Sequence, residues 1–178
     1  LTVNMGGALG DSSWITADDG PMISFQVPTD PFAPCGIGTV LVPPPINLPV
    51  VEVVGACYFQ NQIAAAGLNS AFANFAFADE VTNIAKARNG GVEGFLPFPS
   101  SDPAEGAPWN YSASAEPYGV AGSDCDTDSE TAHVYIDSIM QYFLPRACLT
   151  LDLGCDLWPF TSTKEVVTPA AVQLQILP

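Results

Sequence analysis

Basic residues are scarce in this chain. Its 178 residues include only four lysines and arginines against 19 aspartates and glutamates, and its formal net charge at pH 7 is −15. Nucleic acids and anionic membrane surfaces are bound through clustered Lys and Arg, so we expect neither as a partner. Such acidity suits an extracellular protein or one that collects calcium.

Long apolar runs are absent as well. No run approaches the roughly 18 to 20 residues that span a bilayer, so we expect no membrane span. Residues 1–5 have neither an initiator methionine nor signal-peptide character, and we expect the sequence to begin inside a longer precursor. The hydrophobic fraction of 48% excludes disorder and predicts one globular domain with a sizeable core.

The chain also lacks a zinc-binding pattern. No two of its five cysteines have C-x-x-C spacing, and there is a single histidine, His133. The cysteines therefore favour disulfides in an oxidising compartment. Cys148 and Cys155 are the easiest pair to close, Cys35 with Cys57 is a plausible second pair, and the odd count leaves one cysteine over.

Apolar strands alternate with helical segments along the chain. Strands are predicted near residues 1–5, 22–27, 48–54 and 92–98, and helices near 60–67, 79–88 and 130–144. This alternation predicts an α/β fold with a mostly parallel sheet, in which the first two strands are adjacent and the last helix packs on one face. A long loop over residues 99–128 is expected to be functional or disordered.

Two segments resemble a known superfamily. They are Val3-Asn4-Met5-Gly6-Gly7-Ala8-Leu9-Gly10-Asp11-Ser12-Ser13-Trp14-Ile15 and the stretch from Gly20-Pro21-Met22 through Thr29-Asp30-Pro31 to Pro34. They are similar to secreted bacterial esterases and lipases of the α/β-hydrolase superfamily, clearest over residues 1–34 and loose to about 158. The resemblance implies part of an α/β-hydrolase fold, flanked by helices and completed by an upstream segment outside this sequence.

The resemblance also implies two catalytic residues. Asp30, just past an apolar strand, takes the place of the triad carboxylate, and His133, at the start of the last helix, that of the general base. The superfamily's chain order is Ser, then Asp or Glu, then His. Because Gly-x-Ser-x-Gly occurs nowhere here, the nucleophile is expected upstream. The implied function is a secreted serine hydrolase acting on carboxylic esters.

A second enzyme class is suggested by Gly10-Asp11-Ser12. In Gly-Asp-Ser-Leu hydrolases this serine is the nucleophile, and an Asp-x-x-His near the C-terminus supplies acid and base. Here Ser13 replaces the leucine, and Glu130 stands three residues before His133. With Ser12 as nucleophile the chain would be self-sufficient.

Calcium is the one cofactor that the sequence suggests. Asp124, Asp126 and Asp128 place carboxylates at every second position, as calcium loops do. An EF-hand needs glycine at the sixth position and an acid at the twelfth, which are Ser129 and Tyr135 here. The favoured interpretation is the acidic start of a helix, capped by Ser129 or Thr131.

A third interpretation is non-enzymatic. Few charged residues (13%), 17 prolines and apolar strands also suit a cell-surface or filament-forming subunit on a hydrolase-like scaffold, with self-assembly as its partner interaction. Residues 159–178 resemble a linker into the C-terminal β domain that sorts proteins of the type IX secretion system. That resemblance implies a bacterial cell-surface or released product, with residues 1–158 forming the hydrolase-like domain.

Overall fold

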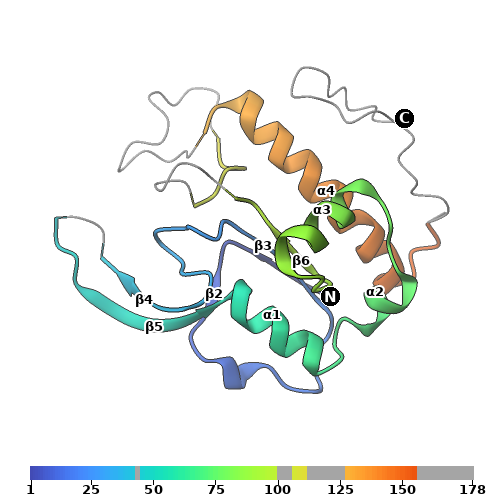
Figure 1. The fold of residues 1–178 in the computed structure, drawn as a ribbon, viewed down its shortest axis with the longest axis horizontal. Coiled ribbons are helices and arrows are strands. Elements are labelled where there is room, and N and C mark those ends of the chain that lie inside the picture. The colour runs from blue at the N-terminus through green and yellow to red at the C-terminus, as the bar shows by residue number, and fades with distance from the viewer. Residues whose placement is uncertain (43–44, 100–105, 112–126, 156–178) are drawn as a thin grey trace.

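The computed structural model describes residues 1–42, 45–99, 106–111 and 127–155, which form a mixed α/β fold (Figure 1). Its elements in chain order are β1 (Thr2–Met5), β2 (Ala8–Leu9), the 3-10 turn η1 (Ser12–Trp14), β3 (Met22–Gln26), β4 (Ile37–Leu41), β5 (Pro49–Gly55), α1 (Ala56–Ala65), α2 (Ser70–Phe75), α3 (Glu80–Asn89), β6 (Phe95–Pro97) and α4 (Ser129–Leu151). The expected α/β class is confirmed.

The first sheet is parallel throughout, in the order β1-β3-β6. Val3 lies opposite Ile23, and Phe25 lies opposite Leu96. The prediction that the first two strands are neighbours is confirmed. Since both connections join parallel strands, all three strands end at the same edge of the sheet.

A second, antiparallel sheet has the order β2-β5-β4, which the expectation of a mostly parallel sheet missed. The extended segment at 48–54 is present as β5, but its partner β4 was not predicted. Gly36 directly precedes that strand and Gly38 lies inside it, and glycine is unfavourable inside strands. The three strands of this second sheet, β2, β4 and β5, are thus antiparallel and do not belong to the parallel sheet.

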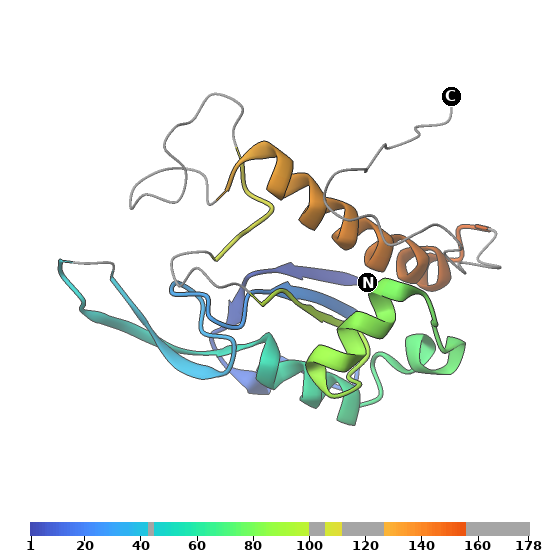
Figure 2. The same cartoon turned by 45° about the horizontal axis from the view of Figure 1, so that its top comes forward.

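Helices cover both faces of the parallel sheet: α4 lies on one side and α1 on the other (Figure 2). The alternation of side chains along β3 explains these layers. Ile23 and Phe25 are fully buried in a core that includes Tyr142 of α4. Ser24 and Gln26 point to the opposite face, where they bond Gln60 and the backbone N–H of Ala56 in α1. Packing of α4 on one face, as predicted, is confirmed.

Helix α4 runs past Pro145 to Leu151, although the proline predicted its end at residue 144. A proline inside a helix removes one backbone hydrogen bond, and burial of the following turn offsets that cost. Arg146 is fully buried and Ala147 is 5% exposed. The helix ends at Asp152, whose φ of 49° is left-handed.

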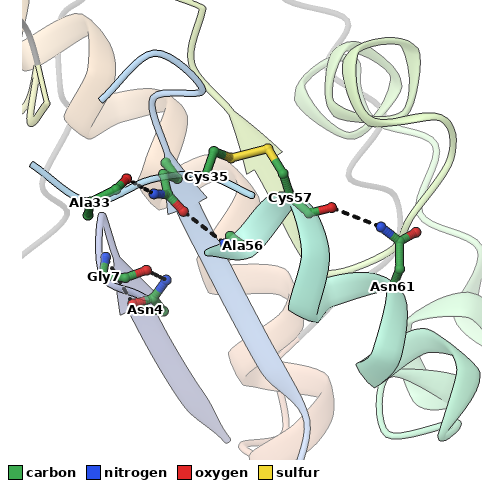
Figure 3. The surroundings of a disulfide bond; sticks show 8 residues. Asn4, Gly7, Ala33, Cys35, Ala56, Cys57 and Asn61 are labelled. Carbon is green, nitrogen blue, oxygen red and sulfur yellow. Dashed lines mark hydrogen bonds between the residues drawn. A yellow bond between two sulfur atoms is a disulfide. The ribbon is translucent and has the colours of Figure 1, made fainter. Parts of the chain in front are cut away.

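Two disulfides confirm the cysteine predictions. Cys148–Cys155 closes the loop after α4, and Cys35–Cys57 joins the segment before β4 to the first turn of α1 (Figure 3). Beside the second disulfide, the Gln26 side-chain amide donates to Ala33 O at 2.7 Å. The fifth cysteine, Cys125, lies outside the described residues.

Candidate functional site

The carboxyl-end edge of the parallel sheet gathers the segments that follow β1, β3 and β6, which is where α/β proteins usually bind ligands. After β1 the chain turns at Gly6, whose φ is 72°, and the Asn4 side chain holds the turn through the N–H and C=O of Gly7. A Cβ at Gly6 would lie 3.6 Å from Trp109 and 3.9 Å from Asp30 Oδ2. Both neighbours therefore lie against this turn.

Asp30 stands at this edge, in the loop after β3, and is half-buried. Its Oδ1 accepts hydrogen bonds from the backbone N–H groups of Phe32 at 2.7 Å and Ala33 at 3.0 Å. A Cβ at Gly106 would lie only 2.8 Å from Oδ1, so the backbone at 106 approaches this carboxylate more closely than a side chain would allow. The loop backbone thus fixes the orientation of the carboxylate.

Aromatic rings connect this edge to helix α4. Phe98, directly after β6, packs against Trp109 with ring centroids 6.0 Å apart and edge-to-face against Tyr135 of α4 at 5.2 Å. Such pairs stabilise beyond their area burial. They hold residues 106–111 and the first turns of α4 together at the edge where Asp30 lies.

His133 lies in the second turn of α4 and is exposed. Its Nε2 lies 3.2 Å from the Tyr111 hydroxyl, and its Nδ1 lies 3.4 Å from the Ser129 hydroxyl. Within the described residues, neither ring nitrogen hydrogen-bonds a carboxylate. The structure thus places Asp30 and His133 at one edge without a hydrogen bond between them.

Ser12 lies in another layer. It belongs to η1, which begins after the capping carboxylate of Asp11; the Ser13 N–H donates to this carboxylate, which lowers the Asp11 pKa. Ile15, at the end of this turn, packs with the core on the α1 side of the sheet. His133 is on α4, across the sheet (Figure 2). A Gly-Asp-Ser site with Ser12 as nucleophile is therefore not assembled in this conformation.

The calcium candidates are only partly described. Asp124 and Asp126 lie outside the described residues. Asp128 caps α4: its carboxylate accepts from Thr131 N and from Thr131 Oγ1, both at 2.9 Å, and these bonds lower its pKa. The cap is therefore Asp128, not Ser129 or Thr131 as expected, because its carboxylate reaches the N–H three residues on. In the part of the chain that the structure describes, no three His, Cys, Asp or Glu side chains form a metal-binding group.

Several contacts around these positions were not anticipated. The partners of the His133 ring come from residue 111, within the long loop, and from residue 129, four positions earlier on the helix. The i to i+4 spacing of Ser129 and His133 is a signal that sequence reasoning had available. Gly106 gave no comparable signal, because its contact with the loop after β3 joins segments distant in sequence.

Comparison with known proteins identifies no relative: no family model, curated protein or solved structure matches this chain. None of the described helices is long and apolar enough to cross a membrane. The expected linker at 159–178 lies outside the described residues. The fold and the edge geometry are therefore the basis for a functional proposal.

Proposed function

We propose that this chain carries the acid and the base of a secreted serine hydrolase that acts on carboxylic esters. The supporting observation is the position of Asp30 and His133 at the carboxyl-end edge of one parallel sheet, the first after β3 and the second near the start of α4. Their order in the chain is that of α/β-hydrolase triads. The two cystines agree with an oxidising, extracellular compartment.

Each residue has a defined chemical role in this proposal. His133 takes the proton of an attacking serine hydroxyl through Nε2 and later returns it to the leaving alcohol. Asp30 accepts a hydrogen bond from Nδ1–H, which fixes the tautomer and stabilises the imidazolium. In the described conformation Tyr111 and Ser129 bond these nitrogens. Catalysis therefore requires the imidazole to exchange both hydroxyls for its catalytic partners.

The serine is proposed to come from an upstream segment of the same precursor. Strand β1 is an outer strand of the parallel sheet, and within the described residues it pairs only with β3. Val3 and Met5 are 42% and 47% exposed, although they lie on the face that carries the core under α4. A further strand and helix beside β1 would bury them and complete an α/β-hydrolase sheet.

The test uses the protein extended to include its upstream segment, with a short-chain nitrophenyl ester as substrate. His133→Ala is expected to lower kcat/KM by several orders of magnitude, because general-base assistance is lost. Asp30→Asn is expected to lower it strongly as well, whereas the matched control Asp18→Asn, an exposed acid outside the edge, leaves it unchanged. Ser12→Ala is expected to be nearly silent.

Three results would count against the proposal. Loss of activity in Ser12→Ala would assign the chemistry to the Gly-Asp-Ser turn. Equal losses of kcat/KM in Asp30→Asn and Asp18→Asn would show that Asp30 has no specific role in catalysis. An extended protein that neither hydrolyses esters nor reacts with a fluorophosphonate probe would favour the non-catalytic surface or filament subunit.

A further inference from the structure

The β4–β5 hairpin extends away from the rest of the molecule (Figures 1 and 2). Six of its large apolar side chains are 46% to 62% exposed, namely Ile37, Leu41, Ile46, Leu48, Val50 and Val51. Val50 and Val51 are neighbours on β5, so both faces of the ribbon are apolar. An isolated two-stranded hairpin is marginally stable in water, and exposed apolar clusters mark interaction sites.

The hairpin is also nearly free of charge. Residues 36–55 contain one charged side chain, Glu52, in a chain whose net charge is −15. Two copies of so acidic a chain repel each other over most of their surfaces. A second copy that approaches the hairpin therefore meets little of this repulsion.

Strand β4 lies at the outer edge of its sheet, and within the described residues it pairs only with β5. Its sequence, Ile37 to Leu41, contains neither a charge nor a proline, the two features that usually protect an edge strand from pairing. The Gly55 N–H donates to Gly36 O at 2.8 Å. Because bonded and non-bonded residue pairs alternate along an antiparallel ladder, the backbone groups of Ile37 and Thr39 point to the outer edge.

We propose that β4 pairs antiparallel with β4 of a second copy of this chain, which joins the two hairpins into one continuous sheet. Antiparallel pairing of a strand with itself is two-fold symmetric, so the contact closes as a dimer. With the axis at Thr39, each Thr39 exchanges two backbone hydrogen bonds with its equivalent. Ile37 then lies opposite Leu41 of the partner subunit, and these apolar side chains cover each other on one face of the sheet.

The experiment measures the molar mass of the protein, extended to include its upstream segment, by size-exclusion chromatography with light scattering over a range of concentrations. A dimer in equilibrium with monomer is expected. Thr39→Pro removes the outward N–H but none of the bonds to β5, and it is expected to raise the dimer dissociation constant at least about tenfold. Thr39→Lys sets two like charges opposite each other at the axis and is expected to do the same.

Ala87→Lys is the matched control, an exposed position on α3 that receives the same charge. Both lysine variants lower the net negative charge, so a non-specific association of acidic chains would be strengthened in both. The proposed dimer is weakened by Thr39→Lys alone. Circular dichroism confirms that each variant keeps its secondary structure. A wild-type chain that stays monomeric at every concentration, or a dimer insensitive to both Thr39 variants, overturns the proposal.

Discussion

The guanidinium of Arg146 lies 3.0 Å from a carboxylate oxygen of Glu93, and the arginine is fully buried. The guanidinium carbon lies 3.5 Å from the ring centroid of Tyr142, and Nη2 also donates to Thr82 Oγ1 at 3.2 Å. Lys86 Nζ forms an ion pair with the other oxygen of Glu93 at 2.7 Å. These contacts join α4 to α3 and to the segment before β6.

Arg146→Ala is expected to lower the free energy of unfolding by about 3 to 5 kcal/mol, because it leaves the Glu93 carboxylate without its buried partner. Urea denaturation measures the change. Arg88→Ala, which removes an exposed arginine from α3, is the control and is expected to cost less than about 1 kcal/mol. The double variant Arg146→Met, Glu93→Gln is expected to be more stable than Arg146→Ala. If Arg146→Ala and Arg88→Ala lower the free energy of unfolding equally, the buried Arg146–Glu93 pair does not stabilise the packing of α4 on α3.

The buried hydroxyl of Tyr142 leads us to expect a loss of stability at high pH. Burial raises the pKa of its hydroxyl from 10.0 to about 12, with Arg146 opposing the shift. The folded state therefore holds the proton more tightly, so the stabilisation is complete below pH 10 and is lost as the pH rises from 10 through 12. Its size is about 2 to 3 kcal/mol. Urea denaturation at several pH values measures the decline.

Tyr142→Phe is expected to lessen that decline, whereas Tyr58→Phe, at an exposed tyrosine, leaves it unchanged. Absorbance at 295 nm should show one tyrosine that ionises later than the exposed ones. A decline that is the same in all three proteins would assign the alkaline instability to other groups.

Removal of Cys35–Cys57 is expected to destabilise the fold more than removal of Cys148–Cys155. The two disulfides span sequence separations of 22 and 7, and a longer closed loop restricts the unfolded chain more. Loop-closure entropy gives about 3 kcal/mol for the first and about 2 kcal/mol for the second. Urea denaturation of the two Cys-to-Ser double variants measures the order. Non-reducing peptide mapping tests the pairing itself, and free thiols at these four positions would refute it.

Tyr111→Phe separates the two states of His133 in the extended protein. The substitution removes the hydroxyl that bonds Nε2 but keeps the ring that lies 5.0 Å from the imidazole. In the proposed mechanism Nε2 accepts the serine proton, so ester turnover is expected to be unchanged or higher in this variant. A loss as large as that of His133→Ala would instead make the tyrosine hydroxyl part of the catalytic machinery.

Local patterns in the sequence predicted the parallel core well. The apolar run of β3, the acidic start and basic end of α3, and the apolar stripe of α4 are each determined by residues close together in the chain. The end of α4 was wrong by seven residues, because burial of Arg146 against distant aromatic rings outweighs the break expected at Pro145. The hairpin strand β4 was missed, since Gly36 before it and Gly38 inside it conceal an extended segment that β5 stabilises.

The candidate site was predictable only in part. The resemblance to α/β-hydrolases singled out Asp30 and His133 as candidates, but the contacts that orient them join residues far apart in sequence, such as Asp30 with Gly106 and His133 with Tyr111. Contacts between residues so far apart in the chain leave no periodic pattern in the sequence. Only the Ser129–His133 contact follows from helical spacing.

The Gln26 side chain links the loop that carries Asp30 to helix α1. Its amide group donates to Ala33 O and accepts from Ala56 N, so the loop that carries Asp30 is fastened to the α1 layer. His133 belongs to α4, on the opposite face of the sheet. The two residues therefore belong to different layers, and a small sliding of α4 along the sheet would change their separation without altering either layer internally.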